Sequence, residues 1–112
     1  MFGKHNARDY VAAMPGVERR TPVYGENTLL SEFRLKAGHA IPRHAHPHEQ
    51  TGYLVSGHMR LSIGAETYDV RPGDSWCVAG GVEHGVEIVE DCIAIEVFSP
   101  VREDYLPGAR SR

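Results

Sequence analysis

The sequence predicts an all-β protein with a sandwich or barrel core, and three observations support this fold class. Apolar and polar residues alternate in short runs, as they do in half-buried strands. Glycine and proline interrupt these runs at the spacing of about 8–12 residues that is typical of sandwiches and barrels. A chain of 112 residues, of which 41% are hydrophobic, is long enough to close one core. We therefore expect a single domain over residues 1–112, with its core at about residues 17–98 and an extension on each side.

The expected elements follow in chain order. The only helix-like stretch covers about residues 8–14, before Pro15. Alternating patterns predict strands at residues 29–36, 53–55, 59–63, 67–70, 76–78 and 86–98. Turns are expected at Ser56-Gly57, at Arg71-Pro72-Gly73-Asp74 and at Asp91, because Gly, Pro and Asp favour turn conformations. Residues 99–112 are polar with two prolines, and we expect them to be only partly ordered.

The last predicted strand presents two different faces. One face carries Ile93, Ile95 and Val97, is wholly apolar, and must be covered. The opposite face places Glu96 among small and aromatic neighbours, where an isolated carboxylate is expensive, so Glu96 is either paired or functional. The apolar face predicts a homodimer, to which residues 17–24 would add a strand, either in cis or exchanged between subunits.

Composition argues against several classes of partner. A net charge of −3 gives no electrostatic basis for binding nucleic acid or an anionic membrane. No apolar run approaches ~20 residues, and the N-terminus has no apolar signal-peptide core, which predicts a cytoplasmic protein. Cys77 and Cys92 lie in strand-like apolar stretches and do not form a CxxC pair. We expect both to be reduced, buried thiols.

A cluster of histidines is the main functional signal. His44, His46 and Gln50 share the parity of one face of an extended strand, whereas Glu49 has the opposite parity and should face away. His84, which follows Gln50 by thirty-four residues, would arrive from a second strand. Three imidazoles and one amide oxygen predict a site for a divalent transition metal. Two points stay open: His48 shares the same parity and is either a ligand or a residue at the barrel mouth, and Gln50 is either a ligand or a structural amide.

These residues resemble the two motifs of the cupin family. Gly38, His44-x-His46, Gln50 and Gly57 have the spacing of the first motif, and Pro72-Gly73-Asp74 with Gly80-x-x-x-His84 has that of the second. The resemblance implies a small double-stranded β-helix, or jelly-roll, barrel with a metal near its centre. Cupins usually carry Glu where this chain has Gln50. The amide makes the site less anionic, so the bound ion would be a stronger Lewis acid.

Further residues resemble one group within this family, the KdgF-type cupins, which linearise 4,5-unsaturated uronates released by pectin and alginate lyases. Gln50, the run from Gly52 to Gly57 and the run from Phe98 to Asp104 carry this similarity. It implies that Phe98 and Arg102 are active-site residues and that Glu96 stands where the family has Asp. The implied substrate is a small carboxylated sugar or enolic acid. Glu96 would move the proton, Arg102 would bind a carboxylate or hydroxyl, and Phe98 would stack on the sugar. Glu96 as a purely structural partner of Arg102 stays open.

Neither the metal nor the reaction follows from the sequence alone. An imidazole-rich site accepts Ni, Zn, Fe or Mn. A second function is an oxygen-dependent iron, copper or manganese dioxygenase similar to quercetinase, and a third is a non-catalytic cupin that binds a small molecule. Oxygen consumption would separate the dioxygenase from the isomerase.

Overall fold

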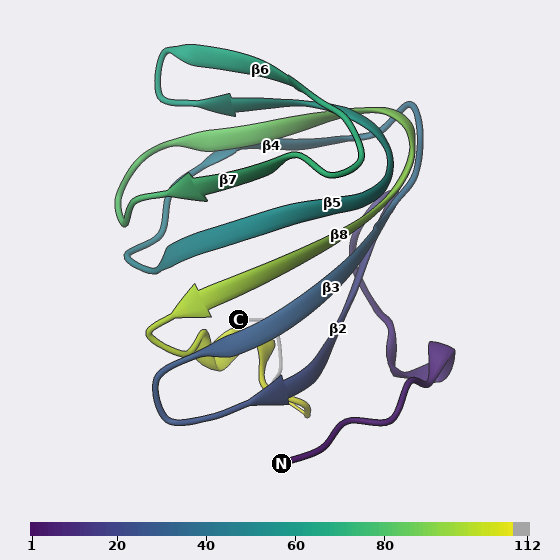
Figure 1. Cartoon of the computed structure of the whole chain (residues 1–112), viewed down its shortest axis with the longest axis vertical. Helices are drawn as coiled ribbons and strands as arrows, with labels where there is room; N and C mark the ends of the chain where they lie inside the picture. The colour runs from purple at the N-terminus through teal and green to yellow at the C-terminus, as the bar shows by residue number, and fades with distance from the viewer. Residues whose placement is uncertain (109–112) are drawn as a thin grey trace.

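The computed structural model describes residues 1–108, and almost all of its regular structure is β-strand (Figure 1). The all-β prediction is therefore confirmed. In chain order the elements are η1 (Ala7–Asp9), β1 (Val11–Met14), β2 (Val17–Tyr24), β3 (Leu29–Leu35), β4 (Ala40–His44), β5 (Glu49–Ile63), β6 (Glu66–Val70), β7 (Ser75–Val78), β8 (His84–Ser99) and η2 (Glu103–Tyr105).

Two long strands, β5 and β8, organise the fold. The strand order is β1-β2-β3-β8-β5-β6, with β4 added on β8 and β7 added on β5. The C-terminal half of β8 pairs with β3 and with the first half of β5. Its N-terminal half pairs with β4 and with the second half of β5. The pair bends over at the right of Figure 1, so each strand serves two facing layers, and both ends of β8 lie at the same end of the barrel.

The turns predicted at Ser56-Gly57 and at Asp91 are wrong, because both positions lie inside continuous strands. They mark the bend instead. Register shifts interrupt the β5–β8 pairing between Leu54 and Met59. Gly57 has a φ of +94°, and a Cβ there would collide with the carbonyl oxygen of Asp91. Glycine therefore allows the two strands to turn together without losing their pairing.

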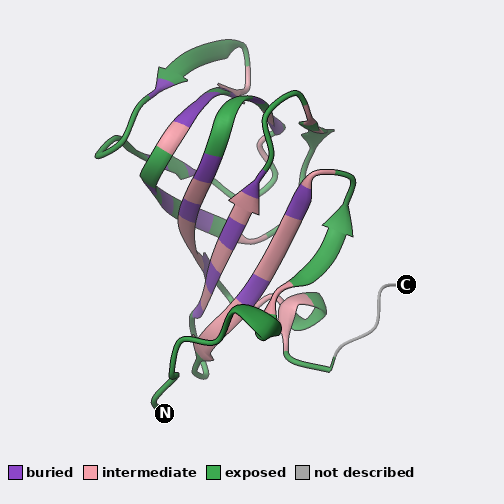
Figure 2. Ribbon diagram, turned by 90° about the vertical axis from the view of Figure 1, so that its right-hand side faces the viewer, coloured by how far each residue is buried: buried purple, intermediate pink, exposed green. Residues whose placement is uncertain are grey.

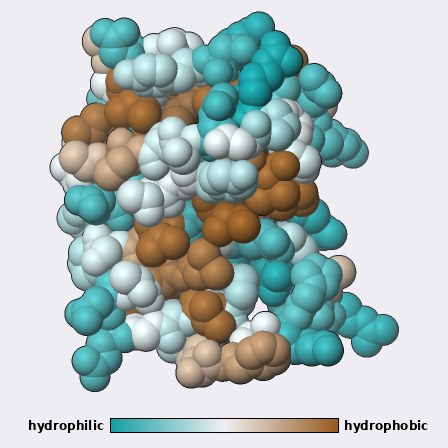
Figure 3. Space-filling view, in the orientation of Figure 1, coloured by the Kyte–Doolittle hydropathy of each residue, from teal (hydrophilic) through white to brown (hydrophobic). Residues whose placement is uncertain are grey.

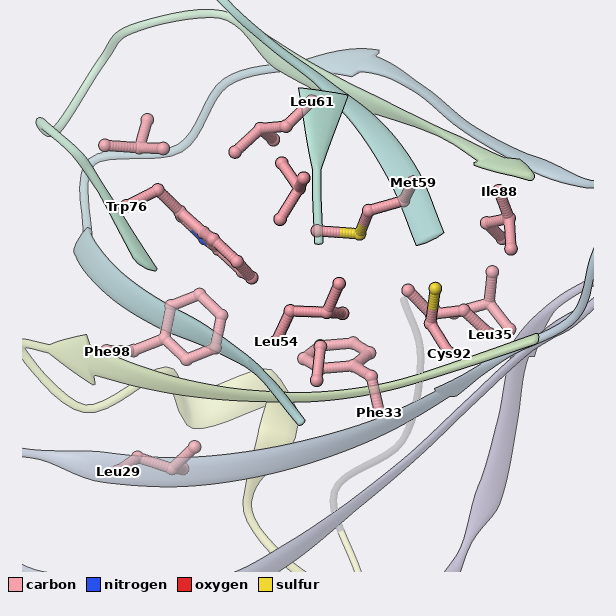
Figure 4. Close-up of a cluster of buried hydrophobic side chains, with 14 residues drawn as sticks. Leu29, Phe33, Leu35, Leu54, Met59, Leu61, Trp76, Ile88, Cys92 and Phe98 are labelled. Carbon is pink, nitrogen blue, oxygen red and sulfur yellow. The ribbon is translucent and has the colours of Figure 1, made fainter. Parts of the chain in front are cut away.

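The core lies between the layers and follows the alternation of the strands. Along β3, Leu29, Ser31, Phe33 and Leu35 are buried, and the residues between them are half-buried (Figure 2). Met59 and Leu61 of β5 point into the interior from one layer, and Phe33 and Phe98 point into it from the other (Figure 4). This interior forms the walls of the candidate site.

The predicted helix at residues 8–14 is wrong: the chain has one short turn, η1, and then the edge strand β1. Tertiary contacts explain the difference. The hydroxyl of Tyr10 donates to Glu32 at 2.6 Å, and Arg34 lies 3.9 Å above the Tyr10 ring. Glu32 also forms an ion pair of 2.7 Å with Arg20. These contacts hold the N-terminal segment in an extended form across β2 and β3.

The segment after β8 is more ordered than its composition suggests. Within residues 99–108 the turn η2 forms, and Val101, Tyr105 and Leu106 pack against the core. The last four residues of the predicted tail, 109–112, lie outside the described part of the chain. None of the helices in residues 1–108 has the length and hydropathy to cross a membrane.

The two cysteines are free, as expected, but only Cys92 is buried. Cys77 is exposed, because β7 alternates and its inward positions are taken by Trp76 and Val78.

Candidate metal centre

Three histidines meet at one end of the barrel. His44 ends β4, His46 lies in the following loop, and His84 begins β8. One ring nitrogen of each lies within 4.8 Å of the corresponding nitrogens of the other two. His44 and His84 are opposed in the β4–β8 register, and their ring centroids are 4.3 Å apart. The sequence argument placed residues 44–50 on one extended strand, whereas β4 ends at His44 and β5 begins at Glu49, so a loop completes the cluster.

Each imidazole is oriented by a backbone carbonyl. The Nδ1 atoms of His44, His84 and His46 lie 2.9, 2.9 and 3.0 Å from the carbonyl oxygens of Pro42, Val82 and His48, respectively. An Nδ1–H that donates to a carbonyl leaves a lone pair on Nε2, which is the form that binds a metal ion. Nε2 of His84 is buried and has no hydrogen-bond partner among residues 1–108. Burial lowers the pKa values of His46 and His84, which favours neutral imidazoles at pH 7.

Gln50 completes the cluster. Its Oε1 lies 2.7 Å from Nε2 of His46. When His46 carries its proton on Nδ1, both of these atoms are acceptors, and two acceptors so close together repel unless they share a cation. Gln50 is 5% exposed, whereas Glu49 is exposed, as their parity predicts. Three imidazole nitrogens and an amide oxygen therefore fit a divalent transition metal.

Glu96 lies directly behind Gln50. Its Oε2 accepts a hydrogen bond from Nε2 of Gln50. Burial raises the pKa of Glu96 to about 8, although the Trp76 indole and the positive charge of Arg102 act in the opposite direction. The indole Nε1 is buried and lacks a well-formed hydrogen bond within the described residues. It lies against Gly52, where any Cβ would collide with the ring. The amide thus links the histidine cluster to this half-buried acid.

Arg102 is held in place by three neighbours. Its guanidinium forms an ion pair of 2.9 Å with Asp104. It lies 3.9 Å from the centroid of the Tyr105 ring and 5.1 Å from that of Phe98. Its side chain is 14% exposed. These contacts leave Arg102 little rotational freedom, so its remaining N–H groups are preorganised for an anion.

Phe98 is tightly packed at the wall of the site. It is 1% exposed, and its ring contacts His46 edge-on at 5.9 Å and Tyr105 at 5.3 Å. Phe98 therefore supports His46 of the histidine cluster and forms part of the cavity wall.

A glycine pair lets the loop before His84 approach the loop that carries His46. A Cβ on Gly80 would collide with the carbonyl oxygen of Pro47, and Gly81 has a φ of +83°. The Gly81 N–H donates to the carbonyl oxygen of His46 at 2.8 Å. These glycines stand where cupins often have a proline. His48 lies outside the three-histidine cluster, and its carbonyl serves to orient His46.

The cluster opens into a cavity of about 330 Å³ inside the barrel. The sequence analysis predicted seven site residues, and six of them lie in the wall of this cavity: His44, Gln50, His84, Glu96, Phe98 and Arg102. Sequence reasoning missed Tyr105 and Asp104, which hold Arg102, and Trp76, which it treated as core alone. An aromatic residue and an acid within three residues of Arg102, in an otherwise polar tail, were the available signal.

Comparison with known proteins assigns the class. The family described as "Cupin domain" matches residues 31–98, more than half of the chain. The chain belongs to the cupin family, and its barrel is the cupin jelly roll, as the sequence motifs predicted. An RmlC-like cupin from Shewanella frigidimarina superposes with a TM-score of 0.88 at 26% identity, covering 94% of this chain and 95% of that one.

Within this family the chain is similar to KdgF proteins. The pectin degradation protein KdgF of Dickeya dadantii is 26% identical over 93 residues, which cover 81% of this chain and 84% of that protein. The structure of KdgF from a Halomonas species has a TM-score of 0.89 at 27% identity, and the match covers 95% of this chain and all of that one. The resemblance stated from the sequence is thereby confirmed.

Proposed function

We propose that this chain is a metal-dependent cupin that opens the ring of 4,5-unsaturated uronates. The observation that carries the proposal is the continuous arrangement of a three-histidine cluster, Gln50, Glu96 and Arg102 around one cavity. Similarity to KdgF proteins, one of which is named for pectin degradation, supports the choice of substrate.

The reaction is an isomerisation that needs no co-reactant. The proton of the anomeric hydroxyl leaves, the bond between C1 and the ring oxygen breaks, and a proton is returned at C4. The product is one open-chain molecule with an aldehyde at C1 and a keto group beside the carboxylate. Glu96 is the candidate to carry this proton, because its carboxylate lines the cavity. Arg102 would bind the substrate carboxylate through the N–H groups that Asp104 does not use.

His44, His46, His84 and Gln50 would hold a divalent ion such as Ni, Zn, Fe or Mn. Such an ion would supply Lewis-acid stabilisation of the negative charge that develops on the substrate. Phe98 and Tyr105 would restrict motion of the site, since they pack on His46 and Arg102, respectively.

A quercetinase-like dioxygenase is the second candidate, and one observation favours it. Much of the cavity wall is apolar, with Met14, Ile41, Met59, Leu61 and Val86 among the lining residues. Such a wall suits an apolar enolic substrate. A cupin that binds a small molecule without reaction is the third candidate.

We further propose that the protein acts in the cytoplasm as a homodimer. Leu30, Tyr53, Val55, Ile93, Ile95 and Val97 form what we call the outer apolar face. Tyr53 and Val55 are 50% and 45% exposed. Figure 3 shows a band of apolar side chains over β3, β5 and β8 on the side seen in Figure 1. β2 pairs with β3 of the same chain and extends the layer, but it does not cover this face.

The test of the catalytic proposal is the loss of ultraviolet absorbance of a conjugated unsaturated uronate monomer under nitrogen. Metal-loaded protein should remove the absorbance, chelator-stripped protein should not, and Glu96→Gln should lower the rate at least tenfold. Oxygen uptake with enolic substrates, together with inactivity under nitrogen, would instead favour the dioxygenase. Near-normal turnover by Glu96→Gln would contradict the proton-transfer role.

A further inference from the structure

The cavity has an apolar chamber that the proposed reaction does not use. We define this chamber by Ala13, Met14, Ile41, Met59, Leu61 and Val86, which line the same cavity as the metal cluster. Met59 and Leu61 point into the interior in Figure 4. Met14, which is 38% exposed, and the exposed Pro42 mark where the chamber reaches solvent, between the edge strands β1 and β4.

The lining changes from polar to apolar along two of the strands that form it, β8 and β4. On β8 the inward positions run from His84, in the metal cluster, to Val86, two residues or about 7 Å farther along the strand. On β4 the same change occurs between His44 and Ile41, and Ile41 is paired with Val86. The polar end and the apolar chamber are therefore adjacent parts of one cavity.

A monosaccharide uronate does not match the whole cavity. Its hydroxyl groups need hydrogen-bond partners wherever they are buried. Among the described lining residues, Gln50 has the only side-chain amide and Tyr105 the only hydroxyl, and both lie with Glu96 and Arg102. Arg43 also lines the cavity, but its guanidinium donates to Glu83 and to the carbonyl oxygen of Gly64. A hydroxylated group placed against Ile41, Leu61 and Val86 would lose hydration without replacement. An alkyl or aryl group would gain from the same surroundings.

We propose that the site also takes enolisable carboxylates with an apolar substituent, an alkyl chain or aromatic ring, that occupies the apolar chamber. The carboxylate and adjacent oxygen of such a ligand would face Arg102 and the metal cluster, so this half of the proposal rests on the proposed function. The apolar half rests on the chamber alone. The substrate class thus extends beyond simple uronates to acids that join a chelating head to an apolar tail.

The test is the affinity of straight-chain 2-oxo acids, from pyruvate to 2-oxooctanoate, for Zn²⁺-loaded and for metal-free protein. Titration calorimetry measures affinity directly, and fluorescence of the single tryptophan, Trp76, gives a second readout. Affinity should rise about fourfold for each added methylene until the chamber is full. The same slope should persist in metal-free protein, with weaker binding throughout. An affinity that does not change with chain length would overturn the proposal.

Substitutions distinguish binding inside the chamber from nonspecific hydrophobic binding elsewhere on the protein. Met14→Gln preserves volume and should weaken the longest acids at least threefold, with no change for pyruvate. Ile41→Asn should further reduce the dependence of affinity on chain length, and thermal unfolding would show whether this variant is folded. Val11→Gln is the matched control, because Val11 lies on the same strand, is 50% exposed and does not line the cavity. Equal effects of Met14→Gln and Val11→Gln would contradict the assignment.

The two proposals fail in different ways. Uronate turnover with no dependence of affinity on chain length would leave the proposed function intact and remove the chamber ligand. A chain-length slope without uronate turnover would do the reverse.

Discussion

Gln50 connects His46 of the histidine cluster to Glu96. Its amide has two ends, and the structure uses both: the oxygen faces His46, and the NH₂ group faces Glu96. A glutamate at this position, which is the usual cupin residue, would place two carboxyl groups against each other, and they would repel once both lose their protons above the raised pKa of Glu96. An amide at position 50 thus suits the half-buried Glu96 behind it.

This pairing predicts that the two residues are coupled. Gln50→Glu adds a second buried carboxylate, and a carboxyl group with a raised pKa destabilises the folded state increasingly as pH rises above its unfolded value. In chelator-stripped protein, the loss of unfolding free energy should be small near pH 4.5 and reach about 1–3 kcal/mol by pH 8.

The swapped double variant, Gln50→Glu with Glu96→Gln, should recover most of this loss in a thermal unfolding series. Glu49→Gln, on the exposed side of the same strand, should change little. A double variant no more stable than Gln50→Glu alone would contradict the coupling.

The site residues that could be predicted are those whose positions follow from the spacing of the two sequence motifs. His44, His46, Gln50 and His84 come together because two motifs flank strands that pair. The carbonyls that orient the imidazoles, and the neighbours of Arg102, could not be predicted, because they depend on loop conformation and on a segment that follows the last strand. The sequence places Asp104 and Tyr105 close to Arg102 along the chain, but it does not show that their side chains meet inside the barrel.

At the element scale, the N-terminal segment is secured through β2 and β3. Arg20 is 7% exposed, and its partner Glu32 also accepts the hydroxyl of Tyr10. Burial alone would raise the pKa of Glu32, but the hydrogen bonds from Tyr10 and Arg20 outweigh it and lower the pKa below the ordinary value of 4.5.

Glu32→Gln should therefore reduce the unfolding free energy by about 1–3 kcal/mol at pH 7. Because the folded pKa is lowered, the stabilisation by Glu32 is present above pH 4.5 and is lost as pH falls through the folded value. The difference between parent and variant should shrink in denaturant titrations from pH 7 to pH 3.

The matched control is Glu66→Gln, since Glu66 is exposed and forms no ion pair within residues 1–108. A difference that is independent of pH would show that the Arg20–Glu32–Tyr10 contacts do not act through the charge of Glu32.

The errors at the element scale have one cause in common. Residues 8–14 form an edge strand because Tyr10 packs on β3, and the expected turns at Gly57 and Asp91 are bends because β5 and β8 remain paired. Local sequence describes each short segment correctly as polar or apolar. It does not reveal that one strand serves two layers.

At the scale of the whole molecule, the outer apolar face makes a testable prediction. Val55→Lys should convert a dimer into a monomer, because the charge would be buried without a partner in the interface. Sedimentation equilibrium measures this directly. Tyr68→Lys on β6 is the control, as Tyr68 is 49% exposed and lies off the outer apolar face. A parent protein that sediments as a monomer would contradict the prediction.

The fold class and its family could be predicted because alternation, turn residues and the two histidine motifs agree with one another. The cavity could not, because its apolar chamber is formed by β1, β4, β5 and β8 together. Residues that look like ordinary core in the sequence, such as Met59 and Leu61, line a site in the folded molecule.

We propose that His44, His46, His84 and Gln50 hold one divalent metal ion. Calorimetric titration of chelator-stripped protein with Zn²⁺ and Mn²⁺ is a direct test of this site. We expect one ion per chain, tighter binding of Zn²⁺ than of Mn²⁺, and a loss of affinity of at least a hundredfold in His84→Ala, while His39→Ala binds as the parent does. Absence of binding, or equal binding by His84→Ala and the parent, would show that these residues do not form a metal site.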